Sequence, residues 1–270
     1  MTTEGLPVAR VIVSGVRRDA VAAWLTARWP LLASTLLLAL LVDLLLGGAV
    51  TTALDPAVRE RMAALPHSPS DVSAALVLDR TGKITTVSTA LLLAGSWAAW
   101  RERSWSALVM AGTTLFSMLA VLAVVKFGLA RGLAVNGDPS LFVPGGQAFP
   151  SGHGAQAALG AALVAVLVAR ARGRRLRRST ALLAVLVPSA VMTSVSLYLG
   201  FHWMSDLAAG ALTGVLAARA GLAVEARLAR RRADRVRIGI PPLGAVTTPF
   251  DAREQAEERS VVLAGSPHVR

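Results

Sequence analysis

Long apolar blocks alternate with polar segments along the chain. The apolar blocks lie at about residues 30–50, 84–100, 104–125, 151–169, 180–199 and 205–224. A helix of about 20 such residues crosses the hydrocarbon core of a bilayer, so each block is long enough to span it. The first block is longer than the core of a signal peptide and starts later, which favours a retained helix. The pattern predicts an all-α, polytopic membrane bundle of about six transmembrane helices.

The polar segments divide the chain into three parts. Residues 1–29 form an N-terminal segment, residues 30–224 a six-helix membrane domain, and residues 225–270 a tail that is first basic and then polar. From about Pro241 the tail has the composition of a mobile segment. Within the domain, we expect residues 51–83 to form a polar loop. Residues 126–150, rich in glycine and proline, are expected to form a structured loop.

The net charge of +12 comes from arginine clusters between the apolar blocks. The densest clusters are at residues 170–178 and 227–237, and six spans place both on the side of the two termini. The positive-inside rule makes that side the cytoplasm. We therefore predict a multi-pass cell-membrane protein with cytoplasmic termini, and with residues 126–150 and 200–204 facing outward. The arginines do not line one amphipathic face, so we expect no nucleic-acid partner. Anchoring at the membrane edge explains them.

Composition narrows the chemistry further. With 54% hydrophobic and 16% charged residues, the chain is more apolar than an ordinary soluble domain. It has no cysteine, and its four histidines lack zinc-motif spacing, so we expect neither a metal nor another cofactor. Asp43 lies inside the first apolar block, where a carboxylate is a functional candidate. Without a named partner, we expect Asp43 to face a polar neighbour or an interface.

Two short segments at block edges carry residues suited to phosphate chemistry. Ser151 follows a proline and is placed to cap the fourth span, whose first turn offers free N–H groups to an anion. Gly152 lets a phosphate approach the backbone, and His153 would point across it. At the start of the sixth span, His202 and Asp206 are four residues apart, and on a helix they would share a face. Asp206 would then fix the tautomer of His202 and leave its other nitrogen free as a nucleophile.

These candidates share the predicted outer side of the membrane. Lys126 ends the third span on that side and adds a cation. A lysine, a helix N-terminus, two histidines and a carboxylate suit in-line displacement at phosphorus. Gly210 and Gly214 have the GxxxG spacing of closely packed membrane helices. We expect them to act within the bundle, with a homodimer as the alternative.

With these residues in view, the chain resembles the type-2 phosphatidic acid phosphatases, or lipid phosphate phosphatases, whose signature is KxxxxxxRP, PSGH and SRxxxxxHxxxD. The resemblance spans roughly residues 84–224. The second motif is complete at Pro150-Ser151-Gly152-His153, and the third keeps Gly200, His202 and Asp206. The resemblance implies roles for six residues: His202 attacks phosphorus to form a phosphohistidine, Asp206 orients it, His153 protonates the leaving oxygen, and Lys126, Ser151 and Gly152 hold the phosphate.

Both signature arginines are absent. Leu133 and Ala134 stand at the RP positions of the first motif, and Val195 and Ser196 at the SR positions of the third. Loss of a charged donor to the transition state typically costs about 10²–10³ in rate. Arg131 lies two residues before the missing arginine of the first motif. We expect its head to swing toward Ser151 and to bind phosphate in its place.

The resulting hypothesis is a membrane phosphatase without a metal, acting at the outer face on a lipid phosphate or polyprenyl (pyro)phosphate. The alternative is a weakened or inactive relative that binds lipid phosphates, which the missing arginines favour. A vanadium haloperoxidase has a similar site by resemblance, but the six spans argue against it. A transporter is disfavoured because no pair of broken helices is evident. The sequence does not name the lipid.

Overall fold

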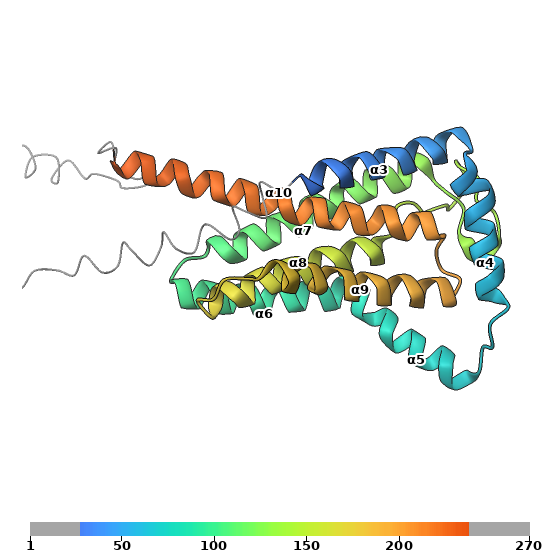
Figure 1. The fold of residues 1–270 in the computed structure, drawn as a ribbon, viewed down its shortest axis with the longest axis horizontal. Coiled ribbons are helices and arrows are strands. Elements are labelled where there is room, and N and C mark those ends of the chain that lie inside the picture. Colours follow the sequence, from blue (N-terminus) through green and yellow to red (C-terminus); the bar gives the residue numbers. More distant parts are fainter. Residues whose placement is uncertain (1–27, 238–270) are drawn as a thin grey trace, which may run out of the picture. The chain divides into compact units, whose positions relative to one another are not determined.

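A computed structural model describes residues 28–237, which are helical with no strand among them (Figure 1). The long helices are α3 (Trp29–Leu46), α6 (Ile84–Glu102), α7 (Ser106–Leu129), α8 (Gly152–Ala171), α9 (Arg178–Tyr198) and α10 (Met204–Arg237). The shorter helices are α4 (Asp55–Ala63) and α5 (Pro69–Asp79), with single turns at Val50–Leu54, Arg80–Gly82 and Ala134–Asn136. The expected all-α membrane bundle is confirmed. The N-terminal segment before residue 28 and the tail from residue 238 lie outside the described residues.

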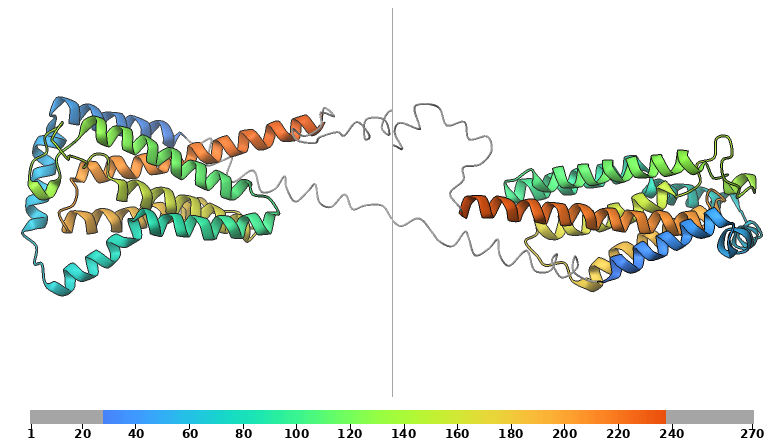
Figure 2. Two further views of the ribbon diagram at one scale, coloured as in Figure 1. Left: turned by 180° about the vertical axis from the view of Figure 1, so that it is seen from behind. Right: turned by 90° about the horizontal axis from the view of Figure 1, so that it is seen from above.

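Five of the six predicted spans are long and apolar enough to cross a membrane: α3, α7, α8, α9 and α10. The remaining one, α6, has 19 residues but a more polar sequence, with threonines in its first turns and Arg101 in its last. It nevertheless packs lengthwise against α7 and α8 within the bundle (Figure 2). Its small buried residues, Ala94, Gly95 and Ala98, explain the close fit.

Helix α8 forms the centre of the bundle. Eleven of its side chains are buried, most of them alanine, glycine or leucine. A Cβ on Gly210 would lie 2.3 Å from the Ser151 carbonyl oxygen, and one on Gly214 would lie 2.2 Å from that of Ala155. Only glycine permits this approach of α10 to α8. The GxxxG pair therefore serves packing within the chain, as expected.

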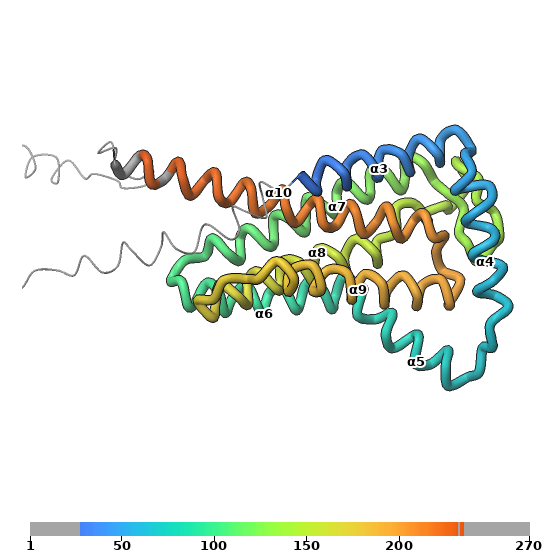
Figure 3. Tube along the Cα trace, viewed as in Figure 1, coloured from blue at the N-terminus to red at the C-terminus, as the bar shows by residue number. Residues whose placement is uncertain are grey.

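The segment 51–83 is not the simple polar loop that we expected. It is largely helical, and α4 lies across one end of the bundle (Figure 3). Pro56 occupies the first turn of α4, while the Ser68 hydroxyl accepts a hydrogen bond from the Asp71 N–H to cap α5. The Tyr198 hydroxyl donates to the Pro66 carbonyl at 2.9 Å, which ties this segment to the end of α9. Capping signals at Ser68-Pro69 were present in the sequence.

Asp43 has the local structural role that we expected. Its carboxylate accepts hydrogen bonds from the Thr51 N–H at 2.9 Å and the Val50 N–H at 3.2 Å, and also from the Thr51 hydroxyl. These bonds satisfy free N–H groups where the chain leaves α3 through Gly47, which adopts a positive φ. Asp43 thus fixes the turn between α3 and α4.

Helix α10 continues to Arg237, past its expected end near residue 224. The chain divides into two units after Glu225, and the described part of the second unit is the helical stretch 226–237. Within the first unit, Arg170 of α8 forms ion pairs with Glu102 of α6 at 2.7 Å and with Glu225 of α10 at 2.8 Å. This cluster joins three helices at the end of the bundle opposite α4.

Candidate active site

The sequence-predicted site residues meet at the end of the bundle that α4 covers. Ser151, Gly152 and His153 begin α8, His202 and Asp206 lie at the start of α10, and Lys126 is in the last turn of α7. Arg131 follows α7 in the loop, and its side chain contacts Asp206. Residues far apart in sequence are therefore brought to one end of the fold.

Ser151 caps α8 as the sequence indicated. Its hydroxyl accepts a hydrogen bond from the Gly154 N–H at 3.3 Å, and its own N–H donates to the Asp206 carbonyl at 2.9 Å. The cap leaves the first backbone N–H groups of α8, those of Gly152 and His153, without partners inside the helix. A long apolar helix with a free first turn favours a negative charge at this position.

Lys126 lies beside this helix terminus. A Cβ placed on Gly152 would be 4.0 Å from the Lys126 Cε, so the lysine stem passes close to the glycine backbone. The Lys126 ammonium donates to the Gln147 carbonyl at 2.5 Å. That bond leaves two N–H donors for an anion. The first turn of α8 and the lysine thus form one cationic corner.

His202 and Asp206 are close, but their geometry differs from expectation. His202 precedes α10, which starts at Met204, so the pair does not share a helical face. The chain turns at this point, and the His202 Nδ1 faces the Asp206 Oδ2 at 3.6 Å. This is longer than a hydrogen bond, and Nδ1 has no other partner. Catalytic hydrogen bonds are often long before substrate binds and tighten in the complex.

His153 has a carboxylate of its own, which sequence analysis missed. Its Nε2 lies 3.6 Å from the Asp79 Oδ2, and Asp79 is buried at the end of α5. Neither the Nε2 nor the Asp79 Oδ1 has a hydrogen-bond partner in the described structure. The site therefore contains two histidine–carboxylate pairs, one from α8 and α5, the other from the start of α10.

The two histidine rings face each other across a short gap. Their centroids are 6.2 Å apart, and the rings are inclined by 61°. Reacting atoms approach to about 3–3.5 Å before bond formation. The centroid separation brings both rings near enough to contact one small anion such as a phosphoryl group.

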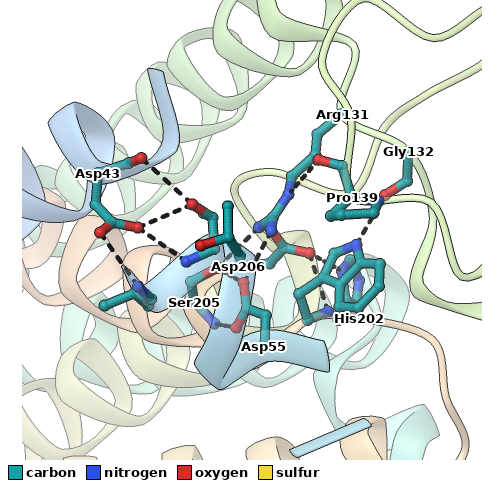
Figure 4. Close-up of polar contacts among 12 residues, drawn as sticks. Asp43, Asp55, Arg131, Gly132, Pro139, His202, Ser205 and Asp206 are labelled. Carbon is teal, nitrogen blue, oxygen red and sulfur yellow. Dashed lines mark hydrogen bonds and ion pairs between the residues drawn. The ribbon is translucent and has the colours of Figure 1, made fainter. Parts of the chain in front are cut away.

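Arg131 does not reach toward Ser151, contrary to our expectation. Its side chain is 0% exposed and points to the start of α10 (Figure 4). It forms ion pairs with Asp206 at 2.5 Å and with Asp55 of α4 at 2.8 Å. Its Nη1 also donates to the Ser205 hydroxyl at 2.8 Å, and its head lies 5.5 Å from the Trp203 ring. With its donors used in this way, Arg131 holds Asp206 in place.

Asp55 completes this buried network and was also missed. It accepts hydrogen bonds from the Ser205 N–H at 2.9 Å and from the Ser205 hydroxyl. Asp206 accepts a further bond from the Trp203 N–H at 3.1 Å. Both carboxylates are thus paired and hydrogen-bonded, as burial of charge requires. The only sequence signal was the pair Asp55-Pro56 as a helix start.

Apolar packing occupies the positions of the two absent arginines. Leu133 packs with Ala134, Ala148 and Trp203. Ser196 is buried in α9 and contacts the Met192 sulfur at 3.6 Å. A Cβ on Gly82 would lie 2.5 Å from the Met192 terminal methyl and 3.3 Å from the His153 ring, so this methionine borders the site.

No group of three or more histidine, cysteine or acidic side chains within residues 28–237 has a geometry that could hold a metal ion. Asp55 and Asp206 are occupied by Arg131, and Asp79 faces a single histidine. The donors that are present suit an anion.

The arrangement of the helices in the bundle is shared with a solved membrane protein. The chain is similar in fold to the "first transmembrane PAP2 type phosphatidylglycerolphosphate phosphatase from Bacillus subtilis", with a TM-score of 0.62. The two share 15% sequence identity over 75% of this chain and 98% of that one. Residues 133–230 match the model of the PAP2 superfamily, which agrees with the resemblance noted in the sequence. No curated protein matches the chain.

Proposed function

We propose that the chain is a membrane phosphatase that hydrolyses a lipid phosphate or polyprenyl (pyro)phosphate through a phosphohistidine on His202. The observation that carries this proposal is the pair of opposed histidines, each facing a buried carboxylate at 3.6 Å. They stand beside the first turn of α8 and Lys126, which supply positive potential for the phosphate.

In the first step the His202 Nε2 attacks phosphorus. Its Nδ1 faces Asp206, which stabilises the positive charge that develops on the ring. As the N–P bond forms, the bond from phosphorus to the lipid oxygen breaks. His153, held by Asp79 through Nε2, gives the proton on its other nitrogen to that oxygen. The products are a lipid alcohol, or a lipid monophosphate from a diphosphate, and a phosphohistidine.

In the second step a water molecule replaces the departed lipid. Neutral His153 now accepts a proton from the water as its oxygen attacks phosphorus, and the N–P bond to His202 breaks. Inorganic phosphate leaves, and both histidines return to their starting protonation states. No step needs an oxidant or reductant. His153 acts first as the acid and then as the base, while His202 acts first as the nucleophile and then as the leaving group.

The charge on the transferred phosphoryl group is met by Lys126 and the N–H groups of Gly152 and His153. Two signature arginines of the family are replaced by Leu133 and Ser196, so the site has fewer cations than the family pattern. Arg131 contributes indirectly, because it holds Asp206, which in turn faces His202. We therefore expect a modest turnover, since each missing charged donor costs about 10²–10³ in rate.

The test is phosphate release by the purified full-length protein in detergent. The substrates are phosphatidic acid, a polyprenyl diphosphate and phosphatidylglycerolphosphate, the last suggested by the name of the structural relative. Activity that disappears in His202→Ala, together with acid-labile ³²P label on the wild type, supports the proposal. Activity that survives in His202→Ala would show that another group is the nucleophile.

A second candidate is a lipid-phosphate binding protein without turnover. The burial of Arg131 in ion pairs, together with the two lost arginines, favours it. This function predicts no phosphate release from any of the three lipids, but saturable binding of at least one of them. Lys126→Ala should then weaken binding, and His202→Ala should leave it largely unchanged.

A further inference from the structure

A pocket lies at the opposite end of the bundle from the candidate active site. It has a volume of about 450 Å³ and is lined by Trp97, Trp100 and Arg101 of α6, and by Ala171, Arg172 and Arg174 at the end of α8. Helix α8 begins at Ser151 in the candidate active site and ends in this pocket. Its 20 residues correspond to about 30 Å, the thickness of the hydrocarbon core. Because α8 runs along the bundle (Figure 1), we place the pocket at the other membrane surface.

The pocket combines cations with aromatic surface. The Arg172 guanidinium lies 5.9 Å from the Trp97 ring, which holds its charged head against the aromatic wall. The Arg101 Nε donates to the Ala171 carbonyl at 3.2 Å, so this head is also held in place. Trp100 is 73% exposed at the rim. Two tethered guanidinium groups and an exposed indole form a site that an anion with an apolar tail would fit.

The neighbouring acidic side chains do not neutralise these arginines. Glu102 and Glu225 are both engaged by Arg170, which lies one turn before the pocket. Within residues 28–237, no ion pair joins Arg101, Arg172 or Arg174 to a carboxylate. Three positive charges in a pocket of this size thus have no counter-ion among the described residues, and the residues that line the pocket include no acid.

We propose that this pocket binds the headgroup of an anionic phospholipid from the surrounding leaflet. The lipid phosphate would lie among Arg101, Arg172 and Arg174, and an acyl chain would run past Trp100 into the bilayer. Guanidinium groups match phosphate oxygens in geometry, and indole rings favour the headgroup level of a membrane. Basic pockets between membrane helices are known as sites for anionic headgroups. The positive-inside rule assigns the pocket to the cytoplasmic leaflet. The proposal does not depend on the phosphatase chemistry.

The experiment is native mass spectrometry of the full-length protein with phosphatidylglycerol and phosphatidylcholine of matched acyl chains. We expect preferential retention of phosphatidylglycerol. Arg172→Gln/Arg174→Gln should weaken that retention by about 25-fold, since each arginine contributes a factor of about five near an anionic headgroup. Arg177→Gln/Arg178→Gln removes the same charge beyond the pocket lining and should have a much smaller effect.

Three results would overturn the proposal. Equal retention of the two lipids would remove the headgroup selectivity. Equal weakening by the two double variants would show that lipid retention depends on general surface charge and not on the pocket. Binding of glycerol 3-phosphate as tight as that of phosphatidylglycerol would make the pocket a site for free phosphate esters. A further variant, Trp97→Phe/Trp100→Phe, tests whether the lipid binds beside these two indoles. Brominated phosphatidylglycerol should quench the fluorescence of this variant less than that of the wild type.

Discussion

The Arg131 Nη1 lies 2.5 Å from the Asp206 Oδ1, and neither side chain is exposed to solvent. Arg131 is therefore a positioning residue. It holds the carboxylate that faces His202, and it binds Asp55 of α4 with its other amino group. In this protein an arginine of the first motif region stabilises the start of α10, and the proposed function leaves the phosphate to Lys126 and the first turn of α8.

Replacement of Arg131 by alanine should destabilise the fold. It would leave the buried Asp55 and Asp206 without a cation, and breaking a buried ion pair costs about 3–5 kcal/mol. Thermal unfolding in detergent measures this loss. Arg80→Ala, an exposed arginine at the same end, should change stability by less than about 0.5 kcal/mol. An Arg131→Ala variant of unchanged stability that no longer binds phosphate would instead restore the phosphate-clamp role.

Asp79→Asn should impair only the reaction that needs a proton on the leaving oxygen. With a lipid phosphate, whose alkoxide leaves poorly, we expect kcat to fall on the order of 10²-fold, the low end for general acid catalysis. With p-nitrophenyl phosphate, whose leaving group needs no proton, kcat should change little. His202→Ala should abolish both reactions. An equal loss on the two substrates in Asp79→Asn would mean that Asp79 acts on folding or on the nucleophile.

If the protein acts as proposed, chelators should not inhibit phosphate release. The proposed mechanism uses histidines, a lysine and backbone N–H groups, and the described residues offer no cluster of metal ligands. Phosphate release measured before and after EDTA treatment should therefore be equal. Inhibition by EDTA that Mg²⁺ reverses would contradict a mechanism built on these side chains alone.

The orientation in the membrane can be tested by cysteine labelling, because the native chain has no cysteine. Ser140 and Ser179 are both exposed and lie at opposite ends of the bundle. An impermeant thiol reagent added to intact cells should label Ser140→Cys and not Ser179→Cys. Labelling of Ser179→Cys alone would invert the topology, and with it the leaflet that the candidate active site faces.

Sequence analysis found the residues that act within short motifs. Ser151, Gly152 and His153 sit in one turn of helix, and His202 and Asp206 in one chain reversal, so local spacing was enough to pair them. The long apolar blocks likewise predicted the spanning helices, because hydrophobic length is a property of the sequence alone. The more polar α6 shows the limit of that criterion, since packing against α7 and α8 holds it in the bundle.

The partner acids could not be found in the same way. Asp55 and Asp79 lie in the segment 51–83, whose polar composition resembled that of a loop. The partners of Asp55 are 76 and 150 residues away in the sequence, and the partner of Asp79 is in α8. The position of Arg131 depended on the loop after α7, which turns back on itself. The Ala148 N–H donates to the Arg131 carbonyl, and the Gly132 N–H to that of Ser140, which directs the arginine inward. Such pairings arise only in the folded chain.

The contacts of Asp55 impose an order on assembly during synthesis. This residue is made early, but Arg131 and Ser205 follow 76 and 150 residues later. Until both have been synthesised, Asp55 lacks the ion pair and the hydrogen bonds that offset the cost of burying its carboxylate. The contacts that hold α4 in place are therefore complete only once α10 is present. A chain cut before α10 would keep the earlier spans but would lack Ser205, so α4 could not complete its contacts at this end of the bundle.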